Sequence, residues 1–215
     1  IYFETPSHAM GNHQSNVRFH EKLKLIVGIA RKSAELNNVL QIPAVRDTLG
    51  KLAAAEAGLG SMISGQIEDA EEMVPGYLNV NRRHMYGTLH WCTQNYATLC
   101  ETVRELMGGG PFQMPADISV INNPELKQKF EAYWSVPGQS AIERMKFLKM
   151  GWDLLGSDFA GRHQQYERFY AGPAFINTLF SFFNCPWDEM TGVVDRVLAG
   201  YDVPAQGEMR HMAAE

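Results

Sequence analysis

The 215-residue sequence predicts an all-α fold in which four long helices pack as an antiparallel bundle. Apolar side chains recur with helical spacing over several long segments. No segment of more than a few residues shows the alternation of a strand, and clusters of glycine and proline divide the chain into helix-length pieces. With 45% hydrophobic and 20% charged residues, the chain can bury a sizeable core.

The first half of the sequence predicts three long helices. The first spans His13 to Leu36 and is apolar on two sides, which favours a position between neighbouring helices. The second follows Pro43, runs to about Glu72 and is rich in alanine and glycine. The third runs from about Val80 to Met107. Residues 1–12 are expected to be an extended lead-in from an upstream region.

The second half predicts a loop over residues 108–121, a short helix to Trp134 and the longest helix of the chain, from after Gly138 to about Tyr170. A last helix is expected from about Pro186 to Leu198. We therefore expect three parts: the lead-in, a helical bundle over residues 13–170, and an aromatic segment, helix and tail over residues 171–215.

Composition excludes several kinds of partner. The formal net charge is -5, and lysine and arginine are scattered singly, so we expect no nucleic-acid partner. The three cysteines show no paired spacing and no secretory leader is seen, which indicates a cytoplasmic protein. The uncharged stretch 169–187 is interrupted by glycine, proline and polar residues. It is expected to face the core or another subunit, and no membrane association is expected.

No metal site or nucleophile is predicted. A di-iron bundle needs two Glu-x-x-His pairs, and the sequence has one, Glu208 with His211 in the polar tail. His163 and Glu167 lie one turn apart, but an ordinary hydrogen-bonded pair is the simpler interpretation. No GxSxG pattern occurs, and Cys92 and Cys100 are expected to be small buried thiols.

Two local features are candidates for a cofactor surface. Three consecutive glycines, Gly108 to Gly110, exceed what a helix end requires and would let a ligand approach the backbone. Neither a Walker loop nor a Rossmann turn fits this context. Near the end of the long helix, Arg162 and Tyr166 lie one turn apart. They form either a polar patch facing a cofactor or subunit, or a solvated helix face.

At these residues the sequence resembles a known family. The segments GNHQSNVRFHEKLKLIVGIARKSAE, GGGPFQMPAD, INNPELKQKF and WDLLGSDFAGRHQQYERFYAG occur in the order and spacing of the oxygenase component of 4-hydroxyphenylacetate 3-monooxygenase and its chlorophenol-hydroxylating relatives. The resemblance implies a helical bundle of the acyl-CoA dehydrogenase C-terminal type. It also implies FADH2 from a separate flavin reductase, O2 and a phenolic substrate, in an assembly of dimers of dimers (a homotetramer).

By resemblance, the residues that contact the phenol lie mainly in preceding domains, so no catalytic residue is assigned here. The implied flavin contacts are Gly108, Gly109, Gly110, Pro111, Phe112, Gln113 and Met114, with Arg162 and Tyr166 on the same surface. Two alternatives stay open: a helical scaffold or oligomerisation module without activity, and a relative of 4-hydroxybutyryl-CoA dehydratase. The second is disfavoured because no cysteine precedes Cys92 to bind its iron-sulfur cluster.

Overall fold

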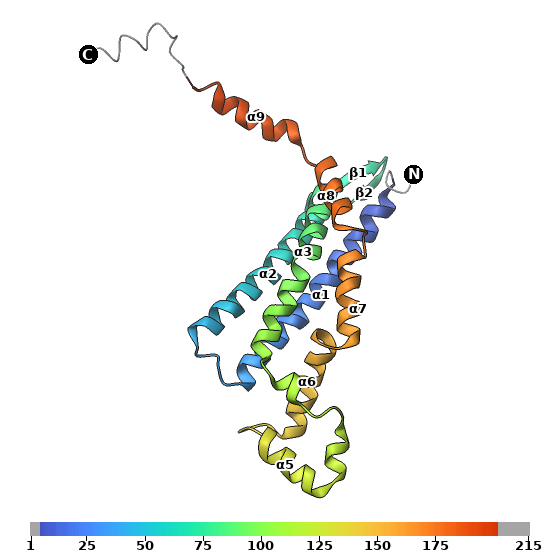
Figure 1. The fold of residues 1–215 in the computed structure, drawn as a ribbon. Coiled ribbons are helices and arrows are strands. Elements are labelled where there is room, and N and C mark those ends of the chain that lie inside the picture. The colour runs from blue at the N-terminus through green and yellow to red at the C-terminus, as the bar shows by residue number, and fades with distance from the viewer. Residues whose placement is uncertain (1–4, 202–215) are drawn as a thin grey trace, which may run out of the picture. The chain divides into compact units, whose positions relative to one another are not determined.

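The computed structural model describes residues 5–201, in a larger unit that ends at Ser181 and a smaller one that begins at Phe182. The predicted all-α class is confirmed, since helices make up most of the described residues in both units (Figure 1). Residues 1–4 of the expected lead-in, and the tail 202–215 with Glu208 and His211, lie outside the described residues.

The bundle is built on three long helices that pack against one another: α1 (Pro6–Leu36), α2 (Pro43–Glu68) and α3 (Arg82–Met107). Two shorter helices, α6 (Ala141–Leu155) and α7 (Asp158–Phe169), follow each other along α3 and complete the bundle (Figure 1). The core consists of the side chains that these helices turn inward, among them Phe19, Leu23, Ile26, Leu59, Tyr96, Val103, Met145 and Leu155.

The expectation of an extended segment up to residue 12 is wrong for residues 6–12, because α1 begins at Pro6. Proline suits the first turn of a helix, where its missing N–H would have no partner. His8, Ala9 and Asn12 are then buried on the inner side of the first two turns. The polar residues His8 and Asn12 hid the helix from a search for apolar spacing.

The predicted long helix between Gly138 and Tyr170 is also wrong, because it is two helices. The backbone N–H groups of Gly156 and Ser157 both donate to the carbonyl oxygen of Trp152, at 2.8 and 2.9 Å, and end α6 there. The Ser157 hydroxyl then accepts from Ala160 N at 3.1 Å and caps the start of α7. The longest helix is therefore α1, with 31 residues.

The expected second helix ends early, at Glu68, and a small hairpin follows, although no strand was predicted. Its strands are β1 (Glu71–Val74) and β2 (Tyr77–Asn79), joined at Pro75 and Gly76, where Gly76 has φ of +82°. Arg82 ties the hairpin to α3, since its Nε donates to Glu71 Oε1 at 2.6 Å. The strands are too short for alternation to have revealed them.

The segment after α3 is not wholly loop. It holds one helical turn, α4 (Gly110–Gln113), and a 3-10 turn, η2 (Ile118–Asn122). The short helix predicted to end at Trp134 is present as α5 (Pro124–Trp134), with the Asn123 side chain accepting from Glu125 N and Leu126 N. Figure 1 places α5 at the end of the larger unit away from the hairpin.

The aromatic segment contains a helix, α8 (Ala174–Phe183), and α9 (Trp187–Leu198) matches the last predicted helix. Phe180 stacks on Tyr86, with ring centroids 4.8 Å apart, and belongs to a second small core. In the smaller unit α9 buries none of its side chains. No helix within residues 5–201 is both long and apolar enough to cross a membrane.

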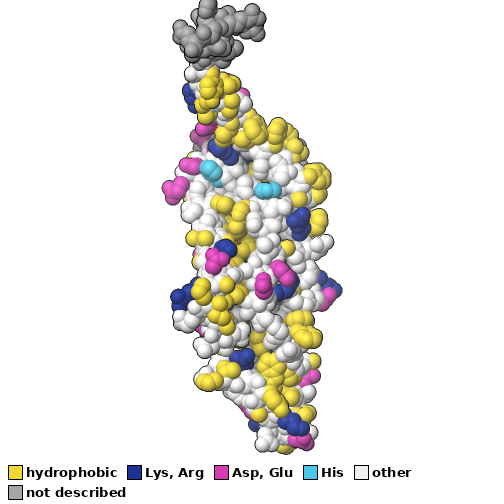
Figure 2. Space-filling view, turned by 60° about the vertical axis from the view of Figure 1, so that its left-hand side comes forward, with side chains coloured by type: hydrophobic (Ala, Val, Ile, Leu, Met, Phe, Trp, Pro, Cys, Tyr) yellow, Lys and Arg dark blue, Asp and Glu magenta, His cyan; other side chains and the backbone are white. Residues whose placement is uncertain are grey.

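Charged side chains show no segregation on the face drawn in Figure 2. Lysine and arginine lie among aspartate and glutamate, and hydrophobic side chains are interspersed between them. Among the described residues, several charged side chains pair along a helix, as in Lys51 with Asp47 and Lys129 with Glu125. This face therefore lacks the continuous basic stripe that a phosphate backbone would need.

Candidate functional site

The glycine loop makes a sharp turn between α3 and α4. Gly108 has φ of +63° and ψ of -153°, a conformation that side chains with a Cβ rarely adopt. At Gly110 an added Cβ would lie 3.2 Å from Leu148 Cδ2, so this glycine allows close packing on α6. Gly109 is exposed, and a Cβ there would meet nothing closer than the end of the Gln113 side chain, at 3.5 Å.

A pocket of about 130 Å³ opens beside this loop, between the end of α3 and α6. Two aromatic side chains line it and are exposed, Phe112 at 80% and Trp152 at 43%. Its other lining residues are Arg104, Met107, Gly108, Pro111, Gly151, Leu155 and Gly156. Such a pocket, apolar with a single cation at its edge, suits a planar ring that carries a negative group.

Close helix packing fixes the floor of this pocket. A Cβ on Gly151 would lie 2.2 Å from Met107 Cε, so α3 and α6 approach each other here because Gly151 has no side chain. Arg104 holds the two helices together from the edge. Its Nε donates to the Leu155 carbonyl oxygen at 2.6 Å and its Nη1 to Glu101 Oε2 at 2.6 Å.

Of the residues predicted to contact a cofactor, Gly108, Pro111 and Phe112 line this pocket, whereas Arg162 and Tyr166 do not. Arg162 is exposed on α7 and pairs with Asp158 at 3.0 Å. Tyr166 lies on the same helix, with the Arg18 guanidinium 4.7 Å from its ring centroid. Gln113 is exposed and Met114 is buried in the main core.

A buried ion cluster around Glu167 was not predicted. Glu167 on α7 is 5% exposed and pairs with both Arg18 and Lys22 of α1. His163 Nε2 lies 3.5 Å from Glu167 Oε1, so the predicted pair is close enough for an ion pair but is longer than an ordinary hydrogen bond. Arg18 and Lys22 lie one helical turn apart, so their spacing signalled a shared face, but nothing in the sequence identified their partner.

The pKa values in this cluster follow from burial and charge. Burial alone would raise the pKa of the Glu167 carboxyl, but hydrogen bonds from Arg18 and Lys22 outweigh it and hold that pKa below its ordinary value. Burial lowers the pKa of His163, and the nearby Lys22 lowers it further. Glu167 is therefore ionised and His163 neutral near pH 7.

The two thiols on α3 are buried, as predicted. Burial raises the pKa of Cys92 and of Cys100, so both are inert thiols at neutral pH. Among residues 5–201, no group of three or more His, Cys, Asp or Glu side chains is arranged to hold a metal ion.

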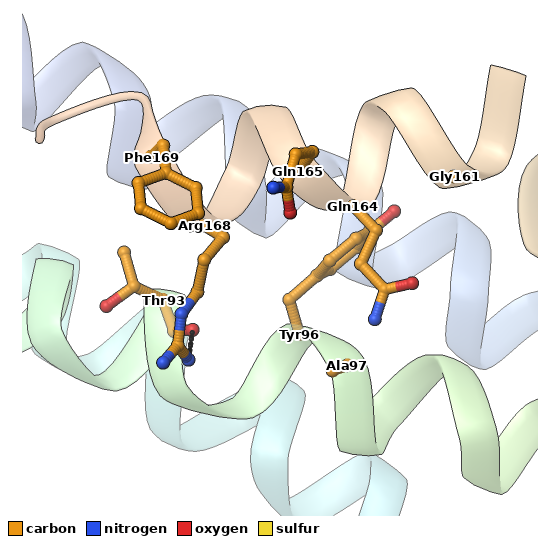
Figure 3. A pocket seen from close by; sticks show the side chains of 8 residues that line it. All are labelled: Thr93, Tyr96, Ala97, Gly161, Gln164, Gln165, Arg168 and Phe169. Carbon is orange, nitrogen blue, oxygen red and sulfur yellow. Dashed lines mark hydrogen bonds between the residues drawn. The ribbon is translucent and has the colours of Figure 1, made fainter. Parts of the chain in front are cut away.

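A second, larger hollow of about 330 Å³ lies between α3 and α7 (Figure 3). Thr93, Tyr96 and Ala97 line its α3 side, and α7 contributes glutamine, arginine and phenylalanine side chains. Arg168 spans the hollow, and its Nη1 donates to the Thr93 carbonyl oxygen at 3.4 Å. No sequence motif marked this place.

Comparison with known proteins agrees with this fold. Residues 1–199 match the family model described as 4-hydroxyphenylacetate 3-hydroxylase C terminal. The chain is 27% identical over 194 residues to the oxygenase component of 4-hydroxyphenylacetate 3-monooxygenase of Escherichia coli, covering 88% of this chain and 37% of that protein. It is 25% identical over 191 residues to the oxygenase component of a Rhodococcus 4-nitrophenol 2-monooxygenase, covering 86% and 37%.

Solved structures show the same fold. The crystal structure of an oxygenase component of 4-hydroxyphenylacetate 3-monooxygenase superposes with a TM-score of 0.86 at 19% identity, over 92% of this chain and 42% of that one. An archaeal 4-hydroxybutyryl-CoA dehydratase from N. maritimus superposes with a TM-score of 0.76 at 14% identity, over 93% and 40%.

The chain thus spans about two fifths of the length of the relatives it matches. The family match itself covers nearly the whole chain, residues 1–199. This chain belongs to the 4-hydroxyphenylacetate 3-hydroxylase C-terminal domain family.

Proposed function

We propose that this chain is the C-terminal, flavin-contacting and oligomerising part of the oxygenase component of a two-component phenol hydroxylase that uses FADH2 and O2. The observation that carries the proposal is the pocket beside residues 108–114, with two exposed aromatic rings and an arginine at its edge. When bound, the reduced flavin would supply the electrons that activate O2.

The pocket fits one part of that cofactor. At about 130 Å³ it is smaller than the roughly 300–1,000 Å³ of sites that enclose a whole ligand. It can take a single ring, such as an adenine, between Phe112 and Trp152. The two hydrogen bonds described above use Nε and Nη1 of Arg104. Its Nη2 can therefore donate to a phosphate oxygen of the cofactor. The adenosine end of FAD is therefore the part that we assign to this pocket.

We assign a second, separate contact surface to Arg162 and Tyr166 on α7. The support is exposure, because the side chain of Arg162 is 80% exposed and that of Tyr166 is held in place by Arg18 and His163. A tyrosine ring held in place one helical turn from an exposed guanidinium can contact a polar cofactor or the surface of a neighbouring copy.

The partners that we propose are a phenolic substrate, a flavin reductase that supplies FADH2, and further copies of this chain, in a dimer or tetramer. Oligomerisation is supported by α9, which buries no side chain. A helix of 12 residues is at the margin of stability in water and needs a packing surface. We infer that α9 packs against a second copy of the chain.

Substitution of Gly109 in the complete oxygenase tests the flavin assignment. Gly109→Val adds bulk at an exposed backbone position where an added Cβ causes no clash, so the fold should be retained. We expect weaker FADH2 binding, measured anaerobically by flavin fluorescence. Phe112→Ala should have the same effect, and Gly28→Ala, on the exposed side of α1, is the control. Unchanged flavin affinity in both variants would refute the assignment.

The activity of the isolated chain provides a second test. We expect no phenol hydroxylation when this chain alone is supplied with FADH2 and O2, because most of the phenol-contacting residues are assigned to the remainder of the oxygenase. Hydroxylated product above the level formed by free flavin would show that the assignment of the site is wrong.

A further inference from the structure

His13 is tied into the interior of the bundle by a chain of three hydrogen bonds. Its Nδ1 lies 2.8 Å from Gln66 Oε1, and Gln66 Nε2 lies 2.8 Å from Thr88 Oγ1. Thr88 Oγ1 lies 2.7 Å from the carbonyl oxygen of His84. Gln66 and Thr88 are 0% and 1% exposed, so their side-chain polar atoms form hydrogen bonds within the protein and not with water. The chain links α1, α2 and α3.

The donor and the acceptor of each of these three hydrogen bonds are fixed. A carbonyl oxygen cannot donate, so the single hydroxyl proton of Thr88 goes to His84 O. Thr88 Oγ1 must then accept from Gln66, which turns the NH2 group of Gln66 toward Thr88 and its carbonyl oxygen toward His13. His13 must therefore carry a proton on Nδ1. In neutral His13, Nε2 has the lone pair and is a hydrogen-bond acceptor.

His13 is partly exposed beside two apolar side chains. It is half-buried, and Nε2 makes no hydrogen bond within residues 5–201. Met10 and Val17 precede and follow it by three and four residues, so they flank it on the same face of α1, at 47% and 39% exposed. A single oriented acceptor within an apolar frame suits a ligand that combines an apolar ring with a hydroxyl group.

We propose that His13 Nε2 accepts a hydrogen bond from the hydroxyl group of the phenolic substrate, with Gln66 and Thr88 as positioning residues that hold the required tautomer. This inference rests on the proposed function, since it takes the substrate of the complete oxygenase to be a phenol. Met10 and Val17 contact the ring. The competing interpretation is that His13 only ties α1 to α2.

Nitrogen NMR of the ring tests the tautomer directly on this chain. Long-range ¹H–¹⁵N spectra distinguish a protonated Nδ1 from a protonated Nε2. We expect neutral His13 to be protonated on Nδ1, and Gln66→Leu to shift it toward the Nε2-protonated form because the inner acceptor is lost. An Nε2-protonated ring in the unmodified chain would overturn the proposal.

Two substitutions of His13 separate the inner bond from the outer one. Asparagine places an amide nitrogen near the position of Nδ1 and can keep the bond to Gln66, but it removes the outer acceptor. Glutamine reaches the position of Nε2 and can present an oxygen there, but it loses the inner bond. In the complete oxygenase we expect His13→Asn to raise the Kd for the phenol roughly 3- to 10-fold, the range for one lost hydrogen bond. His13→Gln should raise it less, although it is the less stable variant.

His20 provides a matched control, because it also joins α1 to α2, through Nε2 and Glu56 Oε1 at 2.7 Å. His20→Asn should weaken that link and leave the Kd for the phenol unchanged. If the oxygenase hydroxylates phenols and His13→Asn binds them as well as the unmodified protein, the role of His13 is refuted and the proposed function stands. If the complete protein with FADH2 and O2 hydroxylates no phenol, the proposed function itself fails.

Discussion

Arg18 and Glu167 lie 149 residues apart in the sequence and meet side by side inside the bundle, where both terminal nitrogens of one guanidinium reach the two oxygens of one carboxylate. Lys22 reaches the same carboxylate from the next turn of α1. Two cations of α1 thus depend on a single anion of α7, and this anion fixes where α7 lies on the bundle.

Removing this anion should be costly. Glu167→Gln keeps the shape of the side chain but leaves Arg18 and Lys22 without a counter-charge in a site where Glu167 is 5% exposed. We expect the free energy of unfolding to fall by about 3 kcal/mol, near the lower end for a broken buried pair, because glutamine still accepts a hydrogen bond. Urea unfolding measures the change. Asp158→Asn, which breaks the exposed pair with Arg162, is the control and should have little effect.

The ion cluster should also give stability a two-step dependence on pH. The pKa of Glu167 is lowered in the fold, so its contribution is present above its ordinary pKa of 4.5 and is lost as the pH falls through the folded value. The pKa of His163 is lowered too, so the unfolded chain takes up that proton first and stability starts to fall below the ordinary value of 6.5. His8, whose pKa burial also lowers, acts in the same upper range.

Urea unfolding at a series of pH values separates these contributions. We expect His163→Gln to reduce the loss of stability between pH 6.5 and 5, and Glu167→Gln to reduce the loss below pH 4.5. Neither substitution touches the exposed Lys24–Glu21 pair, so the contribution of that pair to stability is the same in both variants and in the unmodified chain. Identical pH profiles for His163→Gln and the unmodified chain would contradict the assignment.

Three glycines should respond differently to alanine. Gly108→Ala should lower the free energy of unfolding by about 1–3 kcal/mol, because φ of +63° strains any residue with a Cβ. Gly151→Ala should lower it by about 1–3 kcal/mol, because the new Cβ collides with the buried Met107. Gly28→Ala should raise it by roughly 0.5–1 kcal/mol, since nothing lies within 4 Å and alanine favours the helix. Thermal and urea unfolding would show whether Gly108→Ala and Gly151→Ala are destabilised while Gly28→Ala is stabilised.

Self-association should depend on α9 more than on the aromatic residues of α8. Val193→Asp together with Val197→Asp places charge on side chains that are 49% and 56% exposed, so the fold of the larger unit should be unaffected while the assembly dissociates. Sedimentation velocity measures this. Phe183→Ser should act in the same direction, whereas Phe180→Ser should mainly destabilise the fold, because Phe180 packs on Tyr86 and His8. A monomeric unmodified chain at micromolar concentration would refute the proposal.

The long helices could be predicted from sequence because their apolar spacing is regular over many turns. Met107 and Gly108 were correctly placed at the end of one helix, since glycine after an apolar helix is a strong stop signal. The break at Ser157 was missed because the apolar side chains Trp152, Leu155 and Phe159 keep their spacing across it. A cap residue alone does not show whether a helix begins there or continues.

The candidate site could be predicted less completely. The exposed glycine loop was identified because three consecutive glycines indicate a turn of the backbone whatever the rest of the fold is. Trp152 and Arg104, which form the wall and edge of the pocket, come from other helices and were not identified as its partners. The same holds for Gln66 and Thr88 beside His13: a buried polar pair looks like any other helix residue until the fold brings its partners together.

The interruption at Gly156 and Ser157 also affects how the molecule opens. Because the backbone ladder of α6 ends at Trp152 O and that of α7 starts afresh, one helix can lose its hydrogen bonds while the other keeps them. α6 is held to the glycine loop through Gly110 and Leu148, whereas α7 is held to α1 through Glu167. Amide hydrogens of the two helices should therefore exchange with solvent as separate cooperative units, and ligand binding at the loop should slow exchange in α6 while leaving α7 at its own rate.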